Sequence, residues 1–479
     1  MTAVIGTSVD DVLRSAGAVE LRWDGGALVA GFPESSAADD VQDAIDRLVR
    51  SGTERVRVMR IPDEELRELL AVRDGSGGTV QFDQLPTVLD GAEGPIAELV
   101  ARIIDRAVQL RASDVHIEPA DDGVVVRVRV DGELELLTRQ PLTVAAPLIS
   151  RLKVLANLNI VERRLPQDGQ FTVQAHGRPV DIRLATVATL YGEKVVLRLL
   201  DTRRPAVEIT ALGMHGRALT DFDRMLQSPS GMLIAAGPTG AGKTTTMQCA
   251  LRAINSPTRN VSTLEDPVEY VVPGINHIPV NDAIGAGFAT QLRAILRQDP
   301  DVILIGEVRD AETARIGVQA ALSGRLVLTS LHAQDAVSAI ARLVQFGVEP
   351  HLVAASLRGV VAQRLVRRVC AFCAETYIAT PAERILLGAS AQGDDMRLRH
   401  GVGCALCRGT GFRDRIAAFQ VLDVTADMRD AIADNAPSRV VLEQAQARGF
   451  TSLAQEAMEL ARSGVTTVAE AMRVVGHDV

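Results

Sequence analysis

The stretch GPTGAGKTTT, Gly237 to Thr246, lies between two segments with different hydrophobic patterns. Before it, MLIAA (232–236) is an apolar run of strand length, and after it TTTMQCALRAI (244–254) has apolar residues at helical spacing. A strand, a glycine-rich loop and a helix in this order form the setting of a phosphate-binding loop. The sequence therefore predicts an α/β core built on a parallel sheet.

The residue types in this loop suit the phosphate tail of a nucleotide. Its glycines lack a Cβ, so the backbone can turn tightly and direct its N–H groups at phosphate oxygens. Lys243 is predicted to reach the β- and γ-phosphates, and the hydroxyl of Thr244 to ligate Mg²⁺. The residues expected to bind ATP are Gly237, Pro238, Thr239, Gly240, Ala241, Gly242, Lys243, Thr244 and Thr245.

Hydrolysis also requires a positioned water, and DVILIGEVRD (301–310) contains a candidate residue for this task. Its apolar run, 302–305, is typical of a strand buried on both faces of a parallel sheet, and Glu307 follows the carboxyl end of that strand. Glu307 is therefore predicted to polarise the attacking water or to hold the water shell of the metal. The alternative is an acid that caps the next helix, which suits Asp310 and Glu312 better.

Two further polar clusters follow apolar runs. TLEDPVEY (263–270) has three acids, and LVLTSLHAQDA (326–336) ends an apolar strand with Ser330 and His332. Taken alone, a histidine after a strand is more often a hydrogen-bonded structural residue than a catalytic one. Together with the phosphate loop, however, the two clusters form a family pattern.

The sequence resembles the ATPases of bacterial type II secretion systems and type IV pilus assembly, the GspE/PulE family, over roughly residues 95 to 475. Seven motifs occur in the family order and spacing. They are RASDVHIEP (111–119), RLPQDGQ (164–170), VDIRLATVATLYGEKVVLRLL (180–200), the phosphate loop, LEDPVEY (264–270), LRAILRQDPDVILIGEVRDAETA (292–314) and SGRLVLTSLHAQDA (323–336).

The resemblance implies a hexameric motor with a RecA-like P-loop core and a preceding α/β, PAS-like domain. It assigns an acidic box to Glu265, Asp266 and Glu269, the second nucleotide motif to Glu307, and a histidine box to His332. The family arginines that meet the phosphates match Arg183, Arg198, Arg293, Arg297 and Arg309. Guanidinium groups from a mobile domain or neighbour would compensate transition-state charge only when the site closes. For Arg293 and Arg297, a salt-bridged surface position is the alternative.

This chain departs from the family pattern at a few positions. Arg325 stands where the family commonly has His, and Gln170 replaces a frequent Arg. The histidine box reads SLHAQDA rather than the commoner TLHTNDA. These differences concern the tuning of the site, because Lys243 and Glu307 are both present.

Four of the five cysteines form two CxxC pairs, Cys370 with Cys373 and Cys404 with Cys407. Such pairs bring four thiolates to one tetrahedral centre, so the sequence predicts a zinc site. The intervening ETYIATPAERILLG (375–388) is expected to be helical. A redox-active CxxC is the alternative, but a thioredoxin-like context is absent. In the resembling family, secretion and pilus-extension motors carry this double pair, whereas retraction motors generally lack it. Cys249 is expected to be a small buried hydrophobe.

Composition narrows the class of partner. A net charge of −9 and 3% aromatic residues argue against a nucleic-acid motor, which needs positive grooves and stacking platforms. No apolar run has bilayer-spanning length, and the first residues, MTAVIGTSVDDVLR, lack the pattern of a signal peptide. We therefore expect a cytoplasmic protein that uses ATP, Mg²⁺ and Zn²⁺ and reaches the inner membrane through partners.

The chain is too long for one core, and five parts are predicted. They are a small N-terminal docking domain with a linker (1–90), a mobile α/β domain (91–205), the ATPase core (206–365), a tetracysteine subdomain (366–420) and a helical C-terminal region (421–479). The glycine-rich stretch 75–95 reads as a linker, and 201–212 as a hinge.

The resemblance implies a motor that drives assembly of pilin-like subunits through an inner-membrane platform, as a homo-hexamer. Its N-terminal domain would dock on an inner-membrane protein. A nucleic-acid translocase or DNA-uptake motor of the same P-loop class is the alternative. A scaffold that binds nucleotide without turnover is a further one.

Overall fold

The computed structural model describes residues 8–24, 26–63, 66, 67, 70, 93–175, 178–200, 209–390 and 395–476. The chain divides into two compact units. The first comprises residues 1–203, 370–374 and 401–413, and the second comprises residues 204–369, 375–400 and 414–479. Residues 75–92 of the linker predicted over 75–95 and most of the hinge predicted over 201–212 lie outside the described residues. The last residues of the predicted linker, 93–95, belong to the helix α4 (Glu93–Gln109), so the prediction is wrong for them.

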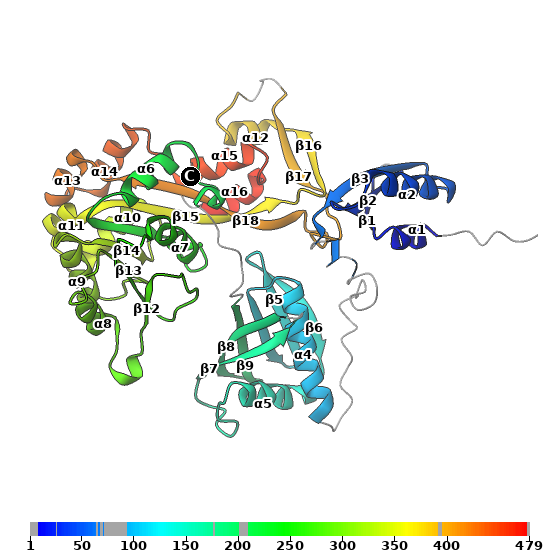
Figure 1. The fold of residues 1–479 in the computed structure, drawn as a ribbon, viewed down its shortest axis with the longest axis horizontal. Helices are drawn as coiled ribbons and strands as arrows, with labels where there is room; N and C mark the ends of the chain where they lie inside the picture. The colour runs from blue at the N-terminus through cyan, green and yellow to red at the C-terminus, as the bar shows by residue number, and fades with distance from the viewer. Residues whose placement is uncertain are drawn as a thin grey trace, which may run out of the picture. The chain divides into compact units, whose positions relative to one another are not determined.

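The second unit is built on a seven-stranded sheet with the order β12-β11-β13-β14-β10-β15-β18 (Figure 1). Neighbouring strands from β12 to β15 are parallel. The strands are β10 (Gly231–Ala236), β11 (Val261–Glu265), β12 (Asn276–Pro279), β13 (Val302–Ile305), β14 (Leu326–Leu331), β15 (Leu357–Val369) and β18 (Phe412–Asp423). The predicted parallel α/β core is confirmed.

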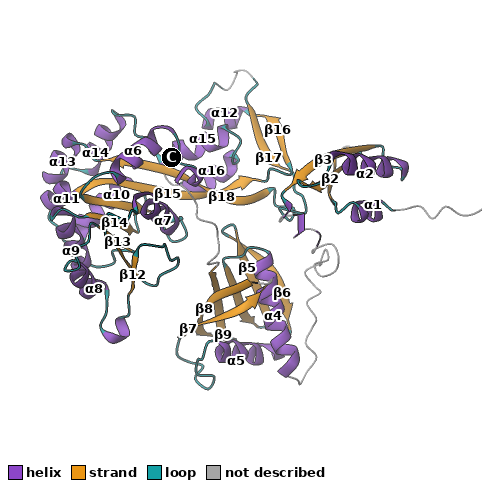
Figure 2. Ribbon diagram, in the orientation of Figure 1, coloured by secondary structure: helices purple, strands orange, loops and turns teal. Residues whose placement is uncertain are grey.

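Helices cover both faces of this sheet (Figure 2), which explains the continuous apolar strands. Successive residues of β10 enter different cores, since Leu233 joins one buried cluster and Ile234 the other. In β13 the same alternation separates Leu304 from Ile303. The helices are α6 (Gly216–Leu226), α7 (Lys243–Ile254), α8 (Phe288–Ile295), α9 (Ala311–Leu322), α10 (Ala336–Gln345) and α11 (Pro350–Ser356), with 3-10 turns η2 (Ile209–Leu212) and η3 (Asp282–Ile284).

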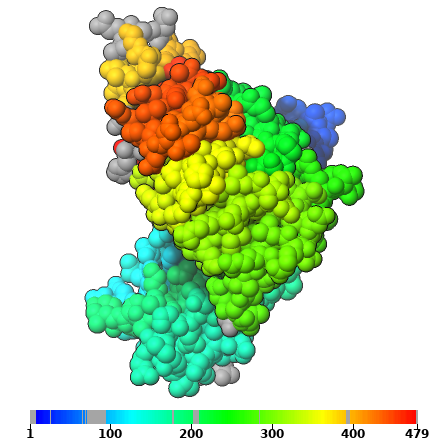
Figure 3. Space-filling model, turned by 90° about the vertical axis from the view of Figure 1, so that its left-hand side faces the viewer, coloured from blue at the N-terminus to red at the C-terminus, as the bar shows by residue number. Residues whose placement is uncertain are grey.

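The chain after the cysteine pairs adds to this core. β18 is the hydrogen-bonded neighbour of β15 and extends past residue 420, so the sheet includes residues from beyond the predicted ATPase part. Four helices follow, and α13 packs against α11 (Figure 3), where the orange C-terminal helices lie against the yellow segment. They are α13 (Ala426–Ala433), α14 (Ser438–Gln446), α15 (Leu453–Arg462) and α16 (Val468–Val475).

The prediction of a helix over 375–388 is wrong for its first part. Residues 374–378 form β16 (Ala374–Ile378), which pairs with β17 (Arg397–Gly401), and only α12 (Pro381–Leu386) is helical. Tyr377 and Ile378 favour a strand, because aromatic and β-branched side chains pack well on a pleated surface. Thr380 then caps α12, and Pro381 occupies its first turn, where the missing N–H costs nothing.

Residues 93–200 of the first unit form a six-stranded antiparallel sheet with the order β6-β5-β4-β9-β8-β7. The elements are α4 (Glu93–Gln109), β4 (Asp114–Ala120), β5 (Gly123–Val130), β6 (Glu133–Gln140), η1 (Leu142–Val144), α5 (Ala145–Leu155), β7 (Gln167–Ala175), β8 (Arg178–Thr189) and β9 (Gly192–Leu200). α4 and α5 pack on one face, where the buried core lies. Polar and charged side chains alternate with this core along the strands.

The N-terminal residues form a separate three-stranded sheet, β1 (Val19–Asp24), β2 (Ala27–Pro33) and β3 (Arg55–Ile61), with helices α1 (Val9–Ser15) and α2 (Ala38–Arg50). β1 and β2 are antiparallel, and β3 pairs parallel to β2 across the α2 crossover. Much of the segment after Ile61 lies outside the described residues. Within the described part of the chain, none of the helices combines the length and apolar character needed to cross a bilayer.

Candidate functional site

The phosphate loop joins the carboxyl end of β10 to the amino end of α7. Gly240 and Gly242 have φ values of 77° and 90°, in the left-handed region that favours glycine. Gly242 is the N-cap of α7 and supplies no side-chain cap. The first N–H groups of α7 are therefore left for a ligand, and an N-terminal helix end favours an anion.

The side chain of Lys243 folds back onto the phosphate loop. Its Nζ donates to the carbonyl oxygens of Gly237 at 2.8 Å and Pro238 at 3.0 Å. Burial lowers the pKa of Lys243, the charge of Glu307 acts in the opposite direction, and Arg364 lowers it further. A bound phosphate group would therefore take the place of the two carbonyl oxygens as the partner of Lys243. Its negative charge would stabilise the ammonium group more than a neutral carbonyl does.

The predicted catalytic residues Asp266, Glu307, Arg309 and His332 lie together at the carboxyl ends of the central strands. Arg309 pairs with Glu307 and lies 3.3 Å from Asp266, joining the turns after β11 and β13. His332 Nε2 lies 3.7 Å from the second oxygen of Glu307. The hydrogen bond that Arg309 donates to Glu307 raises the pKa of Arg309, so this guanidinium stays charged.

Glu265 is buried and contacts two side chains, Thr263 and His277, of which His277 was not predicted. Thr263 Oγ1 donates to Glu265 Oε1 at 2.7 Å, and His277 Nδ1 lies 3.1 Å from the same oxygen. The N–H of Val272 donates to His277 Nε2, so the neutral ring carries its proton on Nδ1, facing Glu265. Glu269 lies half-buried in the turn that follows. No sequence pattern predicts the contact of His277 with Glu265, because the two residues come together only when β12 pairs with β11 in the folded sheet.

Arg293 and Arg297 lie at the end of α8, on the surface. Arg293 pairs with Glu312 on α9, and both side chains are more than half exposed. Arg297 donates to the carbonyl of Arg293 at 3.0 Å. Arg293 is therefore found in a salt bridge on the surface, which is the alternative given above for this residue. Asp310, the suggested helix cap, does cap α9 through the N–H of Thr313.

Arg183 and Arg198 belong to the six-stranded sheet of the first unit, where they are directly opposite on β8 and β9. Arg198 also faces Asp114 of β4, with Nε 3.1 Å from the carboxylate. On the other side, Gln170 of β7 faces Arg183. The residue that replaces a frequent family arginine is thus a direct neighbour of the predicted arginine pair.

Two residues of β15 reach the phosphate loop and were not predicted. Gln363 donates to the carbonyl of Ala241 at 2.7 Å and accepts from Thr246 Oγ1 at 2.8 Å. Arg364 donates to the carbonyl of Gln334, two residues after His332, at 2.7 Å. Their one sequence signal is a polar pair inside an otherwise apolar run, VVAQRLV (360–366).

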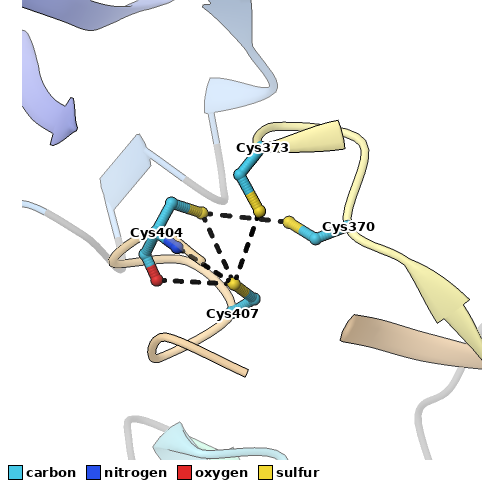
Figure 4. Close-up of side chains that lie close together, drawn as sticks. All are labelled: Cys370, Cys373, Cys404 and Cys407. Atoms are coloured by element: carbon cyan, nitrogen blue, oxygen red, sulfur yellow. Dashed lines mark hydrogen bonds between the residues drawn. The ribbon is translucent and has the colours of Figure 1, made fainter. Parts of the chain in front are cut away.

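The four cysteines of the CxxC pairs form a buried cluster (Figure 4), and their Sγ atoms all lie within 4.8 Å of one another. The Sγ–Sγ distances are 3.9 Å for Cys370–Cys404, 3.7 Å for Cys373–Cys407 and 3.7 Å for Cys404–Cys407. A regular tetrahedron with Zn–S bonds of about 2.3 Å has sulfur atoms about 3.8 Å apart. The donor set therefore fits zinc, and all four thiols are free of disulfides.

Backbone groups support this cluster. The N–H groups of Cys404 and Gly411 donate to Cys407 Sγ at 3.2 and 3.3 Å. Such bonds orient a thiolate ligand and stabilise its negative charge. Cys249 is not part of the cluster and is buried on α7, as predicted; burial raises the pKa of its thiol to about 11.

A glycine loop between a buried strand and a helix, with an acid at the end of a second parallel strand of the same sheet, defines a P-loop ATPase with a RecA-like core. The model of the family described as Type II/IV secretion system protein matches residues 90–473. The chain belongs to this family.

Curated relatives agree with the assignment. The chain is 43% identical over 397 residues to a type II secretion system protein, HxcR, of Pseudomonas aeruginosa, covering 82% of this chain and 81% of the relative. It is 40% identical over 407 residues to the type IV pilus assembly ATPase PilB of Myxococcus xanthus, covering 83% and 70%.

Solved structures support the fold. The ATPase DotB of Legionella pneumophila has a TM-score of 0.58 and 19% identity, covering 79% of this chain and 95% of that one. The pilus retraction motor PilT with bound ADP has a TM-score of 0.52 and 24% identity, covering 78% and 96%. The predicted resemblance and fold class are therefore confirmed.

Proposed function

We propose that this chain is a homo-hexameric motor that hydrolyses ATP in the cytoplasm to drive assembly of pilin-like subunits in a type II secretion or type IV pilus machine. An inner-membrane platform and a docking protein would be its partners, with residues 1–90 as the docking part. The observation that carries the proposal is the cluster of Glu307, Arg309, Asp266 and His332 beside the phosphate loop, in a chain of the secretion family.

In the proposed reaction, Lys243 leaves its loop carbonyls and binds the β- and γ-phosphates. Thr244 would hold Mg²⁺ with the help of the acidic box, and the ion would supply charge compensation on the phosphate oxygens. Glu307 orients the water for in-line attack. Arg309 and His332 fix the carboxylate of Glu307, so its orientation depends on the segments that follow two strands, β13 and β14.

Arg183 and Arg198 would complete the site when it closes. The two arginines are directly opposite each other on neighbouring strands, so a single anion could meet both guanidinium groups. A γ-phosphoryl group in transit carries charge on three oxygens and is the kind of anion that such a pair stabilises. Hydrolysis would then depend on the position of the six-stranded domain. This dependence would couple ATP hydrolysis to the movement of that domain.

The tetracysteine cluster favours secretion or pilus extension over retraction. Its sulfur positions fit Zn²⁺, and in the resembling family the double CxxC pair belongs to assembly motors. The metal would be structural, because four thiolates leave no open coordination position for substrate.

Complementation tests this function in a strain that lacks the chain. Wild-type protein should restore secreted proteins or surface pili, whereas Glu307→Gln, expressed at the same level, should not. Full restoration by Glu307→Gln would contradict the motor. A nucleic-acid translocase would instead show ATP turnover stimulated by DNA or RNA and steeply weakened by salt.

A further inference from the structure

Gln363 occupies a position that places it against the phosphate loop. β15 runs parallel to β10, with Ala362 opposite Ala236 at the end of β10. The next residue of β15 is Gln363, and the next residue after β10 is Gly237, the first of the phosphate loop. Gln363 is only 1% exposed. A buried amide costs free energy unless its donor and acceptor are both bonded, so this side chain needs specific partners.

Both partners belong to the nucleotide site. The carbonyl of Ala241 can only accept, so the Gln363 amide must direct Nε2 towards it, at 2.7 Å. The Oε1 atom then faces Thr246, whose hydroxyl donates at 2.8 Å. Gln363 thus joins the loop before Lys243 to the helix after Thr245, and it spans the residues predicted to bind phosphate and metal.

The surrounding packing leaves little freedom for this arrangement. A Cβ on Gly242 would lie 3.0 Å from Gln363 Nε2, and one on Gly237 would lie 2.8 Å from the Gln363 carbonyl oxygen. The loop therefore approaches β15 as closely as glycine allows. A side chain that cannot bond at both ends would leave the Ala241 carbonyl or the Thr246 hydroxyl without this partner.

We infer that Gln363 is a positioning residue that holds the phosphate loop and the first turn of α7 at the spacing required for ATP. The inference deepens the proposed function, on which its role in the motor rests. Gln363 acts through Ala241 and Thr246 and touches no reacting atom itself. Its effect should therefore appear mainly in nucleotide affinity.

The test compares full-length variants by titration with a fluorescent ATP analogue and by steady-state turnover. Gln363→Leu removes both bonds at similar volume. Thr246→Val keeps the shape and removes the hydroxyl that bonds Gln363 at 2.8 Å and also lies 3.4 Å from the carbonyl oxygen of Gly242. Gln420→Leu is the matched control, because Gln420 is also buried in this sheet but bonds the N–H of Ala336 at the start of α10. Thermal unfolding of each variant reports folding.

Gln363→Leu should raise the Kd for the analogue and the KM for ATP about tenfold, with a smaller change in kcat, whereas Gln420→Leu should leave both near wild type. Thr246→Val should weaken binding less, and adding it to Gln363→Leu should weaken binding no further, because the shared bond is already lost.

Wild-type affinity in a folded Gln363→Leu protein, or fully additive losses in the double variant, would overturn the inference. If Gln363→Leu does not fold, unchanged affinity in Thr246→Val overturns it instead. A wild-type chain that binds and turns over ATP but does not restore secretion or pili would defeat the motor proposal alone.

Discussion

Arg198 Nε lies 3.1 Å from Asp114 Oδ1, across two neighbouring strands of the six-stranded sheet. Ser113 Oγ donates to the other carboxylate oxygen at 2.8 Å, and Arg129 approaches it at 4.0 Å. The Asp114 side chain is nearly buried, while that of Arg198 is 54% exposed. Asp114 therefore holds Arg198 by its Nε and leaves the terminal nitrogens of the guanidinium available for an anion.

Asp114→Asn should lower kcat about tenfold with little change in ATP affinity. The amide keeps the shape of Asp114 but loses the charge that orients Arg198, and we propose that Arg198 acts only in the transition state. The measurement is steady-state turnover beside equilibrium binding of ATP. Asp122→Asn is the control, since Asp122 pairs with Arg139 in an exposed turn of the same sheet. Equal kcat in both variants would refute the role of Asp114.

Glu307→Gln should bind ATP as tightly as wild type and lose at least about a hundredfold in kcat. The amide can still accept a hydrogen bond from Arg309, but it cannot orient the attacking water as a carboxylate does. Single-turnover hydrolysis on preformed complexes measures the loss directly. Glu312→Gln, which removes only the surface partner of Arg293, should retain turnover. Near-normal hydrolysis by Glu307→Gln would remove this residue from the reaction.

Purified protein should contain one zinc ion per chain, bound by the four clustered thiolates. Elemental analysis under reducing conditions measures the content, and Cys404→Ser should reduce it and lower the thermal unfolding temperature. Cys249→Ser, outside the cluster, should keep full zinc content. Metal-free protein with reduced thiols would contradict the assignment.

Glu470 on α16 should make the unfolding of the second unit sensitive to acid. Burial raises the pKa of this carboxyl, but hydrogen bonds from Arg473 and Arg367 outweigh it and lower the pKa to about 2. A carboxyl whose pKa is lower in the folded than in the unfolded protein stabilises the folded state at pH values above the unfolded pKa. This stabilisation is lost as the pH falls towards 2. Each pKa unit corresponds to about 1.4 kcal/mol, so the contribution is about 3 kcal/mol at neutral pH.

Glu470→Gln should therefore lower the free energy of unfolding by about 3 kcal/mol at pH 7, and the difference from wild type should shrink between about pH 4.5 and pH 2. Chemical denaturation across this range measures it. A constant difference between the two proteins over the whole range would show that the charge of Glu470 is not the cause.

Local patterns predicted the nucleotide core well. β10 and β13 are buried on both faces, so each appears in the sequence as an unbroken apolar run. The glycines of the phosphate loop predict its tight turn, because Gly240 and Gly242 adopt positive φ. The hairpin between β5 and β6 also has a local sequence signal, because its two-residue turn is Asp131-Gly132 and both residues adopt positive φ.

Relationships between distant segments could not be predicted in this way. Gln363 meets Thr246 across 117 residues, and His277 meets Glu265 only because β12 lies beside β11. β18 joins the core sheet after the cysteine segment, and no local pattern specifies which sheet a strand enters. The catalytic roles of the arginines and the boundaries of the five predicted parts stay predictions.

The dependence of hydrolysis on Arg183 and Arg198 tests the account most directly. The measurement is kcat for ATP in the protein carrying both Arg183→Ala and Arg198→Ala, alongside ATP affinity. Loss of transition-state charge compensation predicts a fall in kcat of at least about a thousandfold with ATP binding largely retained. Unchanged kcat in the double variant would contradict the coupling of domain position to hydrolysis.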